Sequence, residues 1–415
     1  MPVIQVRNRL RRSESVTGAT VQLARPGLPA PITATTNNGG VANLVTTGLA
    51  DGAYTLTITP AATTADPVGP AIGNAASPDR IFRSLRVDVT LTATSIATAT
   101  VPVSEIPNGT VAVTANAPMV ASLQPVWMRS PNSRTRGHDV SGIIIHHTGG
   151  PTIGGALEEF LNNQTSAHYL IDTDGQIVKM VLDARAASHA GVARWNGDSS
   201  VNARTIGIEI VNATGAYPAV QYTALTGLLT RLRAAFPTLD PWYVIGHSDV
   251  AVNDSERLGR KSGDPGLEFE WARVEALGLG MSASATPIAP TLYAGFFSTF
   301  PTESLRLGDN DARRQFGGSR RPTLVGDPLR ELQTDLQTIG YEAGHPDGDF
   351  GQKTHFAVMM FQEHFFAGGR GHKAPDGRVD QQTAMKIKAV VVQKAVSQMT
   401  RALPTAPAGA APAGR

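Results

Sequence analysis

Ionisable side chains end or interrupt three apolar segments in the middle of the chain. The stretch GIIIHHTGG follows its isoleucines with His146 and His147, and the stretch WYVIGH ends with His247. Glu209 lies inside a third apolar stretch, TIGIEIVN. A buried charge is costly unless it is paired or bound to a metal. We therefore interpret the three segments as strands whose polar residues meet at one edge of a sheet.

This set of residue types can perform a specific kind of chemistry. Two histidines and one carboxylate are a standard ligand set for catalytic zinc, which keeps its fourth position for water. Bound zinc lowers the pKa of that water towards about 7 and polarises a carbonyl oxygen. Hydrolysis then needs a base, for which Glu209 is suited, and a cation near the developing oxyanion, which Lys261 can supply. The residues predict metal-assisted hydrolysis of an amide or ester.

The segment that carries these residues, 118–280, alternates between helical and strand patterns. Apolar residues in IGGALEEFL and in YTALTGLLTRLRAAF recur at helical spacing, and short apolar strands lie between and around them. The alternation predicts an α/β domain with a mixed sheet flanked by helices.

Residues 1–117 show the two-residue alternation of β-strands. In AYTLTITP, Tyr54, Leu56 and Ile58 fall on one face and threonines on the other. Short alternating segments separated by NNGG and ADG turns predict an all-β sandwich. The order GATVQL, ATTNNGGVANL, LADGAYTLTI resembles the carboxypeptidase-regulatory-like sandwiches, which implies an accessory domain.

The remainder of the chain is predicted to be helical at its centre and irregular on both sides. Residues 281–325 lack sustained periodicity and are predicted to be a linker. Residues 326–400 contain three helical patterns and are predicted to form a small three-helix domain. The tail 401–415 is rich in Ala, Pro and Gly, a composition typical of disorder.

Bulk composition excludes several classes of protein. A chain of 415 residues is long enough for two to four domains. Its 36 basic and 34 acidic residues nearly balance, so no nucleic-acid partner is expected. The absence of cysteine excludes disulfides and thiolate metal sites. No apolar run is long enough to predict a membrane span.

Five motifs of the central domain occur in the order found in zinc-dependent N-acetylmuramoyl-L-alanine amidases of the type-2 family, which includes the peptidoglycan recognition proteins. They are GIIIHHTGG, SAHYLIDTDGQIVKMV, ASHAGVARWNG, RTIGIEIVN and GHSDVA…GRKSGDPG. The resemblance implies a catalytic zinc ion held by His146, His247 and Asp264. It implies that Glu209 is the general base and that Lys261 stabilises the oxyanion.

The resemblance also implies a substrate groove, for which His168, His189 and Gly191 are the matching positions. Core hydrogen bonding is an equal alternative for the two histidines, and packing is an equal alternative to ligand contact for Trp195. Two positions depart from the family pattern. Ala167 stands where some relatives have a catalytic tyrosine, which leaves the proton transfer to Glu209.

The second departure lies in the loop that carries the third ligand. Relatives usually have one residue between the lysine and the aspartate, whereas this chain has two, Ser262 and Gly263. Nearby, Asp249 is interpreted as orienting the loop, and His147 as supporting the site rather than binding the metal.

The C-terminal helical segment resembles three-helix peptidoglycan-binding domains. The matching features lie in LQTDLQTIGYEAGHPDGDFGQKTHFAVMMFQEHF and DGRVDQQTAMKI. The resemblance implies a second, independent contact with the cell wall, and such tethering raises the effective concentration of a catalytic domain at its substrate.

Taken together, the residues and the resemblances predict a peptidoglycan hydrolase that uses Zn²⁺ to cleave the amide between N-acetylmuramic acid and L-alanine of the stem peptide. One alternative is a recognition protein that binds peptidoglycan without cleaving it. Another is an amidase-bearing component of a phage tail or contractile injection particle, assembled through the N-terminal sandwich. The N-terminus lacks a recognisable secretory signal, so we expect cytoplasmic synthesis and delivery to the wall by a non-Sec route or within a particle.

Overall fold

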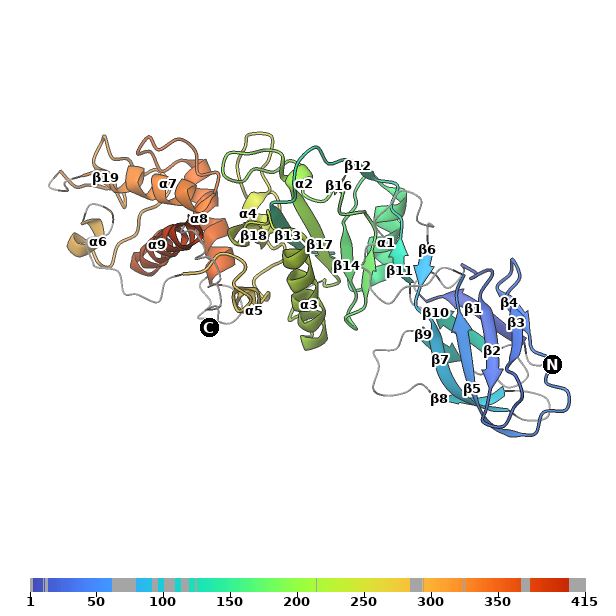
Figure 1. Ribbon diagram of the computed structural model, residues 1–415. Helices are drawn as coiled ribbons and strands as arrows, with labels where there is room; N and C mark the ends of the chain where they lie inside the picture. Colours follow the sequence, from blue (N-terminus) through green and yellow to red (C-terminus); the bar gives the residue numbers. More distant parts are fainter. Residues whose placement is uncertain are drawn as a thin grey trace, which may run out of the picture. The chain divides into compact units, whose positions relative to one another are not determined.

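The computed structural model describes residues 3–9, 11, 14–61, 80–91, 96–100, 109–112, 119–123, 125–213, 215–283, 293, 295–322, 324, 326–366 and 374–402. Apart from its first two residues, the tail predicted to be disordered lies outside the described residues. The chain forms two compact units, whose helices and strands are labelled in Figure 1. The first unit comprises Met1–Asp139, His147–His189 and Ile206–Pro237, and the second comprises Val140–His146, Ala190–Thr205 and Thr238–Arg415.

The N-terminal strands of the first unit form two sheets, in the orders β4-β1-β10-β9 and β3-β2-β5-β7-β8. In β5, Tyr54, Leu56 and Ile58 are buried between less buried threonines, as the two-residue alternation predicts. Apolar side chains of both sheets share one core, which supports the predicted sandwich. The strands are β1 (Val3–Asn8), β2 (Thr20–Ala24), β3 (Ile32–Thr35), β4 (Val41–Asn43), β5 (Gly52–Thr59), β7 (Leu85–Leu91), β8 (Ile96–Thr100), β9 (Gly109–Ala112) and β10 (Met119–Leu123).

Within the first unit, the strands of the central sheet follow the order β17-β14-β15-β11-β6. Within the first unit, β14 pairs with β17 in parallel and with β15 antiparallel, so the predicted mixed sheet is confirmed. The strands of this unit are β6 (Arg80–Phe82), β11 (Pro125–Met128), β14 (Tyr169–Ile171), β15 (Ile177–Lys179) and β17 (Thr205–Ile210), with β12 (Ser133–Thr135) and β16 (Arg185–Ala187) forming a separate pair.

Two helices of the first unit follow the predicted stripes. Helix α1 (Ile153–Asn162) buries Ile153, Leu157 and Phe160 in one cluster with apolar residues of the sheet. Helix α3 (Ala219–Ala235) buries Leu225, Leu228, Leu229 and Leu232. None of the described helices is both long and apolar enough to cross a membrane.

The second unit begins with the two strands that carry the histidines. β13 (Gly142–His147) and β18 (Val244–Gly246) pair in parallel, and the three isoleucines of β13 are fully buried. Four short helical segments complete this part of the unit: α2 (Val201–Arg204), the 3-10 turn η2 (Pro241–Tyr243), α4 (His247–Val250) and α5 (Trp271–Glu275).

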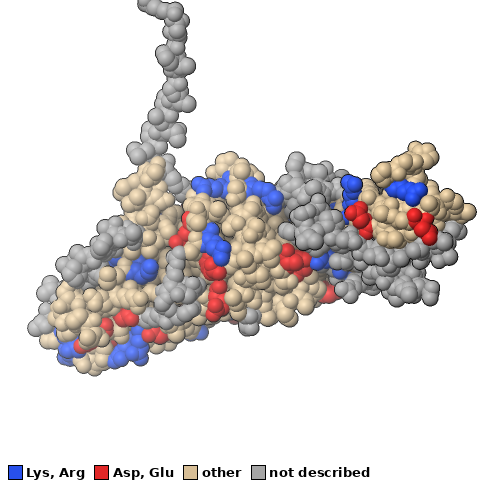
Figure 2. All heavy atoms as spheres, turned by 90° about the horizontal axis from the view of Figure 1, so that it is seen from below, with Lys and Arg blue, Asp and Glu red and all other residues tan. Residues whose placement is uncertain are grey.

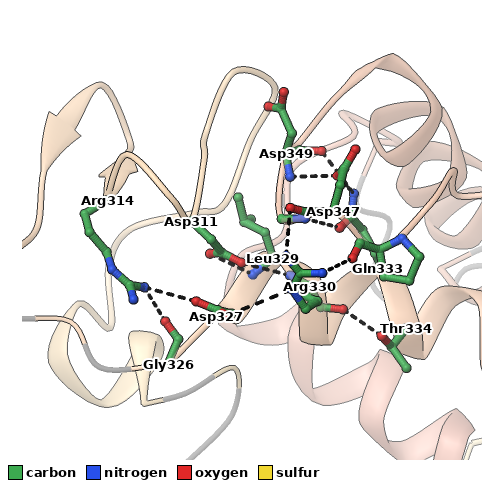
Figure 3. Close-up of polar contacts among 12 residues, drawn as sticks. Asp311, Arg314, Gly326, Asp327, Leu329, Arg330, Gln333, Thr334, Asp347 and Asp349 are labelled. Carbon is green, nitrogen blue, oxygen red and sulfur yellow. Dashed lines mark hydrogen bonds and ion pairs between the residues drawn. The ribbon is translucent and has the colours of Figure 1, made fainter.

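The C-terminal part of the second unit contains the three predicted helices, α7 (Pro328–Ile339), α8 (Gln352–Phe365) and α9 (Gln381–Ala402). They follow α6 (Phe296–Thr299) and the small pair β19 (Gln315–Phe316) and β20 (Ser319–Arg320). The carboxylate of Asp311 accepts hydrogen bonds from the backbone N–H groups of Leu329 and Arg330, which fixes the first turn of α7 (Figure 3).

A buried glutamine organises the loop after α7, and the same network recurs after α8. The side-chain amide of Gln333 donates to Asp347 (Figure 3), and its carbonyl accepts from the Gly348 N–H. Gln362 makes the equivalent bonds to Asp376 and Gly377. Each aspartate lies 14 residues after its glutamine, so the helical part of the unit contains an internal repeat.

One hydrophobic core extends through the second unit. Ile144, Trp195 and Ile245, which surround the histidine-bearing strands, belong to the same buried cluster as Leu336 of α7 and Phe361 of α8. The segment 281–325, predicted to be a linker, contributes side chains to that core as well: Tyr293, Phe296, Phe297, Leu305 and Phe316. Burial of these aromatic residues gives the segment a packing role that its lack of periodicity does not indicate.

Charged side chains are dispersed over the surface drawn in Figure 2. Basic and acidic residues lie interspersed there among uncharged ones, and the described residues of this face show no extended patch of one sign. This distribution agrees with the nearly balanced charge of the sequence.

Candidate metal centre

His146 and His247 lie side by side because the backbone places them there. The parallel register pairs Ile145 of β13 with Gly246 of β18, so the next residue along each chain segment is a histidine. The carboxyl ends of parallel strands lie at the same edge of a sheet. The centroids of the two imidazole rings are 4.4 Å apart.

The loop that follows Lys261 brings Asp264 to the same place. The Ser248 N–H donates a 2.8 Å hydrogen bond to the Asp264 carbonyl, which ties the loop to the residue next to His247. Gly246 allows this close approach, because a Cβ atom there would lie 2.8 Å from Cδ of Pro265. Any larger residue at position 246 displaces the loop that carries the carboxylate.

Three atoms with lone pairs converge at this point, and all three residues are buried. The Nδ1 atoms of His146 and His247 are 3.0 Å apart, and Oδ2 of Asp264 lies 2.9 Å from Nδ1 of His247 and 3.8 Å from Nδ1 of His146. Tetrahedral zinc with ordinary bond lengths separates its ligand atoms by roughly 3.3 Å. The spacing therefore fits a small divalent cation with one position left open.

The proton positions on His247 also favour a cation. Its Nε2 lies 3.0 Å from the Ala190 carbonyl, which can only accept, so Nε2 carries the proton. In the neutral ring, Nδ1 then has a lone pair directed at the Asp264 carboxylate, and two acceptors in contact require a shared cation. Among the described residues, these three form the one group of His, Asp and Glu with the spacing of a metal site.

The electrostatics keep the two outer groups of this trio unprotonated near neutral pH. Burial, followed by the charge of His247, lowers the pKa of His146 to about 4, and the charge of Lys261 adds to this lowering. Burial alone would raise the pKa of Asp264, but its contacts with the His146 and His247 rings outweigh burial and hold that pKa well below its ordinary range. Metal ligands must be deprotonated, so both groups are in the binding form.

Several other predicted residues lie in the second unit. Lys261 is exposed, and its charge acts on His146. Gly191 is exposed with a positive φ of 58°, and it packs beneath the guanidinium of Arg260. Trp195 is 3% exposed and contacts Tyr243 and Tyr341, a position that favours the packing alternative.

Arg260 is a further residue of this region that sequence reasoning missed. Its guanidinium donates 2.8 Å hydrogen bonds to the carbonyls of Ala190, Val192 and Val252. Ala190 is also the acceptor that fixes the His247 ring. The signal available in the sequence was a second basic residue directly before Lys261.

Glu209, His168 and His189 belong to the first unit. Glu209 is buried in β17, in register with Leu170 of β14. His168 is fully buried: its Nδ1 accepts from the Gly207 N–H, and its Nε2 faces Arg136 and the Arg185 carbonyl. Hydrogen bonds at both ring nitrogens favour the core alternative for His168.

The environments of His189 and His147 differ from that of His168. His189 is 8% exposed, and a Cβ on Gly207 would lie 2.4 Å from its ring, so the glycine makes room for the imidazole. Nδ1 of His147 accepts a 2.8 Å hydrogen bond from the Gly149 N–H and thereby closes the turn after β13. This bond gives His147 a structural role.

The fold and the site together define a mixed α/β domain with a buried two-histidine, one-carboxylate centre. Residues 136–266 match the family model for N-acetylmuramoyl-L-alanine amidase, and residues 325–387 match a model for peptidoglycan binding domains. Two segments of the chain thus match the amidase family and a peptidoglycan-binding family, in the order that the motifs predict.

Curated relatives match the amidase segment. The 1,6-anhydro-N-acetylmuramyl-L-alanine amidase AmpD of Salmonella typhimurium is 37% identical over 120 residues, 29% of this chain and 60% of the relative. The N-acetylmuramoyl-L-alanine amidase AmiD of Escherichia coli is 26% identical over 155 residues, 33% of this chain and 53% of the relative. The chain thus spans less than two thirds of the length of these relatives.

Solved structures show a longer but weaker likeness. The amidase AmpDh3 from Pseudomonas aeruginosa aligns with 68% of this chain and 99% of its own, at 22% identity and a TM-score of 0.46. Assembly into a phage or injection particle, an alternative drawn from the sequence, is not supported by the curated relatives.

Proposed function

We propose that the protein hydrolyses the amide bond between N-acetylmuramic acid and L-alanine of the peptidoglycan stem peptide. The observation that carries this proposal is the buried convergence of His146, His247 and Asp264 inside a segment that matches the amidase family. Zinc bound there supplies a water of lowered pKa and a Lewis acid for the carbonyl oxygen.

Residues of the chain bind the metal, transfer the proton and stabilise the oxyanion. His247, held by the Ala190 carbonyl, and His146, kept neutral by burial, present unprotonated Nδ1 atoms to the metal. Glu209 accepts a proton from the attacking water and returns it to the leaving amine of L-alanine. Lys261, exposed and positively charged, stabilises the oxyanion that develops on the carbonyl. His189 and Gly191 border the groove for the substrate.

The C-terminal helices are proposed to bind the same polymer, because residues 325–387 match a family defined by that property. Two contacts on one polymer raise the local concentration of the cleavable bond. This proposal places the site of action at the cell wall.

Digestion of purified sacculi tests the proposal. The wild-type protein should release stem peptides with a free L-alanine amino terminus, detected by mass spectrometry. A zinc chelator should abolish the release and added zinc should restore it. His247→Ala should be inactive, whereas His138→Ala, which changes an exposed histidine, should match the wild type.

The same experiment separates the enzyme from a recognition protein. A protein that sediments with sacculi but releases no stem peptide, with or without zinc, is a binding module. Release that continues undiminished after chelation or in His247→Ala would show that the trio is not the catalytic centre.

A further inference from the structure

The C-terminal helices contact the two chain segments that carry His247 and Asp264. This contact was not expected, because the sequence assigns the helices to wall binding. It consists of buried and part-buried hydrogen bonds within the second unit. They are made by side chains of α8 and by Tyr341, which lies two residues beyond the end of α7.

Glu363 of α8 holds the loop that leads to Asp264. Its Oε1 accepts a 2.8 Å hydrogen bond from the Gly263 N–H, and its Oε2 accepts a 2.9 Å hydrogen bond from the Ser262 hydroxyl. Ser262 and Gly263 are the two residues between Lys261 and Asp264, where the family resemblance leads us to expect one. The loop before Asp264 therefore has a hydrogen-bonding partner in the C-terminal helices.

The same carboxylate reaches the segment after His247. The side chain of Ser248 is close enough to Glu363 to lower the pKa of its carboxyl group, although burial raises that pKa overall. Glu363 itself is 4% exposed. One buried carboxylate thus joins the residue after the second histidine to the residues before the aspartate.

Asp249 is held by two further side chains of the helical part. Its Oδ1 accepts a 2.7 Å hydrogen bond from the Tyr341 hydroxyl, and its Oδ2 lies 2.9 Å from Nδ1 of His364. Oδ2 also accepts from the Gly246 N–H at 2.8 Å, directly before His247. The His364 ring stacks on Trp271 of α5 at a centroid distance of 4.0 Å.

We propose that Glu363, Tyr341 and His364 are positioning residues for the metal centre, which fix the spacing between His247 and Asp264 through Ser248, Asp249, Ser262 and Gly263. The inference rests on the zinc site of the proposed function. Groups that orient metal ligands without touching the metal typically change metal affinity by about 10–100-fold when they are altered. Here those groups come from a domain that the sequence assigns to another task.

Zinc affinity of the full-length protein, measured by competition with a chromogenic chelator, tests this role. Glu363→Gln keeps the side-chain volume but places an amide NH₂ group, which cannot accept, against the Gly263 N–H or the Ser262 hydroxyl. Loss of that hydrogen bond should loosen the loop before Asp264 and raise the zinc Kd about tenfold. Tyr341→Phe should raise it several-fold. Asp335→Asn is the matched control, because Asp335 is a buried carboxylate of α7 that pairs with Lys388 of α9.

Replacing zinc with cobalt gives a measurement, the visible absorption spectrum, that general destabilisation of the protein does not change. The visible absorption of Co²⁺ depends on coordination geometry, so its band positions or intensities should change in Glu363→Gln and stay unchanged in Asp335→Asn. Ser262→Ala, which removes one hydroxyl from a loop residue, should shift the spectrum in the same direction with little effect on folding.

The outcomes separate the two proposals. Zinc affinity and cobalt spectra that are unchanged in Glu363→Gln, Tyr341→Phe and Ser262→Ala would overturn the positioning role while leaving the amidase proposal intact. A wild-type protein that binds no zinc would overturn the metal site itself, and the positioning role with it. Weakened zinc binding equal in Asp335→Asn and Glu363→Gln would also overturn the role, since it would reflect destabilisation alone.

Discussion

At the scale of single residues, the metal centre depends on which atom of each side chain holds a proton. The Ala190 carbonyl places the proton of His247 on Nε2, and burial removes the proton from His146. Asp264 remains ionised because its contacts with the two imidazole rings hold its pKa well below the ordinary range. The trio is therefore prepared for a cation by its surroundings, before any cation arrives.

Zinc-free protein should keep His146 neutral down to about pH 4. Burial, followed by the charge of His247, lowers its pKa from 6.5 to about 4. Between these values the unfolded chain binds a proton that the folded chain does not bind. The contribution of His146 to the free energy of unfolding is thus complete above pH 6.5 and is lost as the pH falls towards 4.

Nuclear magnetic resonance of the imidazole ring measures this pKa directly, in protein treated with chelator. The His146 signals should titrate with a midpoint near pH 4. A midpoint near 6.5 would show that the ring is hydrated, which is incompatible with its 1% exposure.

At this scale the sequence was most informative where chemistry is local. His146 and His247 each end an apolar strand, and Asp264 precedes a proline in a recognisable loop, so the motif order located all three positions that the structure brings together. Glu363, Tyr341 and His364 could not be found in this way. They lie 92 to 115 residues from their partners along the chain, and no local pattern connects them.

At the scale of elements, Gly340 marks the contact between the end of α7 and the histidine-bearing part of the second unit. Its φ is 131°, and a Cβ there would lie 2.6 Å from Cζ2 of Trp195. The Asn196 N–H also donates a 3.0 Å hydrogen bond to its carbonyl. Backbone of the helical part thus packs directly against an indole ring of the amidase segment.

Gly340→Ala should lower the free energy of unfolding of the second unit by roughly 2–5 kcal/mol, the sum of left-handed strain and overpacking. Gly308→Ala is the matched control, because Gly308 has a φ of 91° with no atom within 4 Å of a Cβ. Gly308→Ala should lower the free energy of unfolding only by the left-handed strain, roughly 1–2 kcal/mol. Equal losses in urea denaturation of the two variants would contradict the contact with Trp195.

Elements were predicted well where one face of a periodic pattern is buried. The alternation in β5 and the stripes of α1 and α3 match the buried residues of the structure. The segment 281–325 shows the limit, because Tyr293 and Phe296 are buried without a repeating pattern. Isolated aromatic residues in irregular backbone give no period from which burial can be inferred. The repeat of Gln333 and Gln362 was not predicted from the sequence, because the hydrogen bonds that define it join each glutamine to an aspartate 14 residues away.

At the scale of the whole chain, the segment that matches the amidase family and the segment that matches the peptidoglycan-binding family share one hydrophobic core. Val250 of the amidase segment and Leu332 of α7 belong to one buried cluster. The N-terminal strands, by contrast, have a cluster of their own, which includes Leu56. A chain arranged in this way should lose stability in the metal-binding segments when the C-terminal helices are weakened.

Native-state hydrogen exchange can measure this coupling. Phe361→Ala removes a fully buried ring from α8 and should lower the free energy of opening by about 3–5 kcal/mol. The loss should be equal for amides of α7 and for those of β18 and α4, because all of them depend on the same core. Leu56→Ala should lower the stability of the N-terminal core, to which Leu56 belongs, by about 2–5 kcal/mol. It should leave the hydrogen-exchange protection of β18 and α4 unchanged. If Phe361→Ala affected only the C-terminal helices, they would be an independent domain, and the metal-binding segments would keep their protection without them.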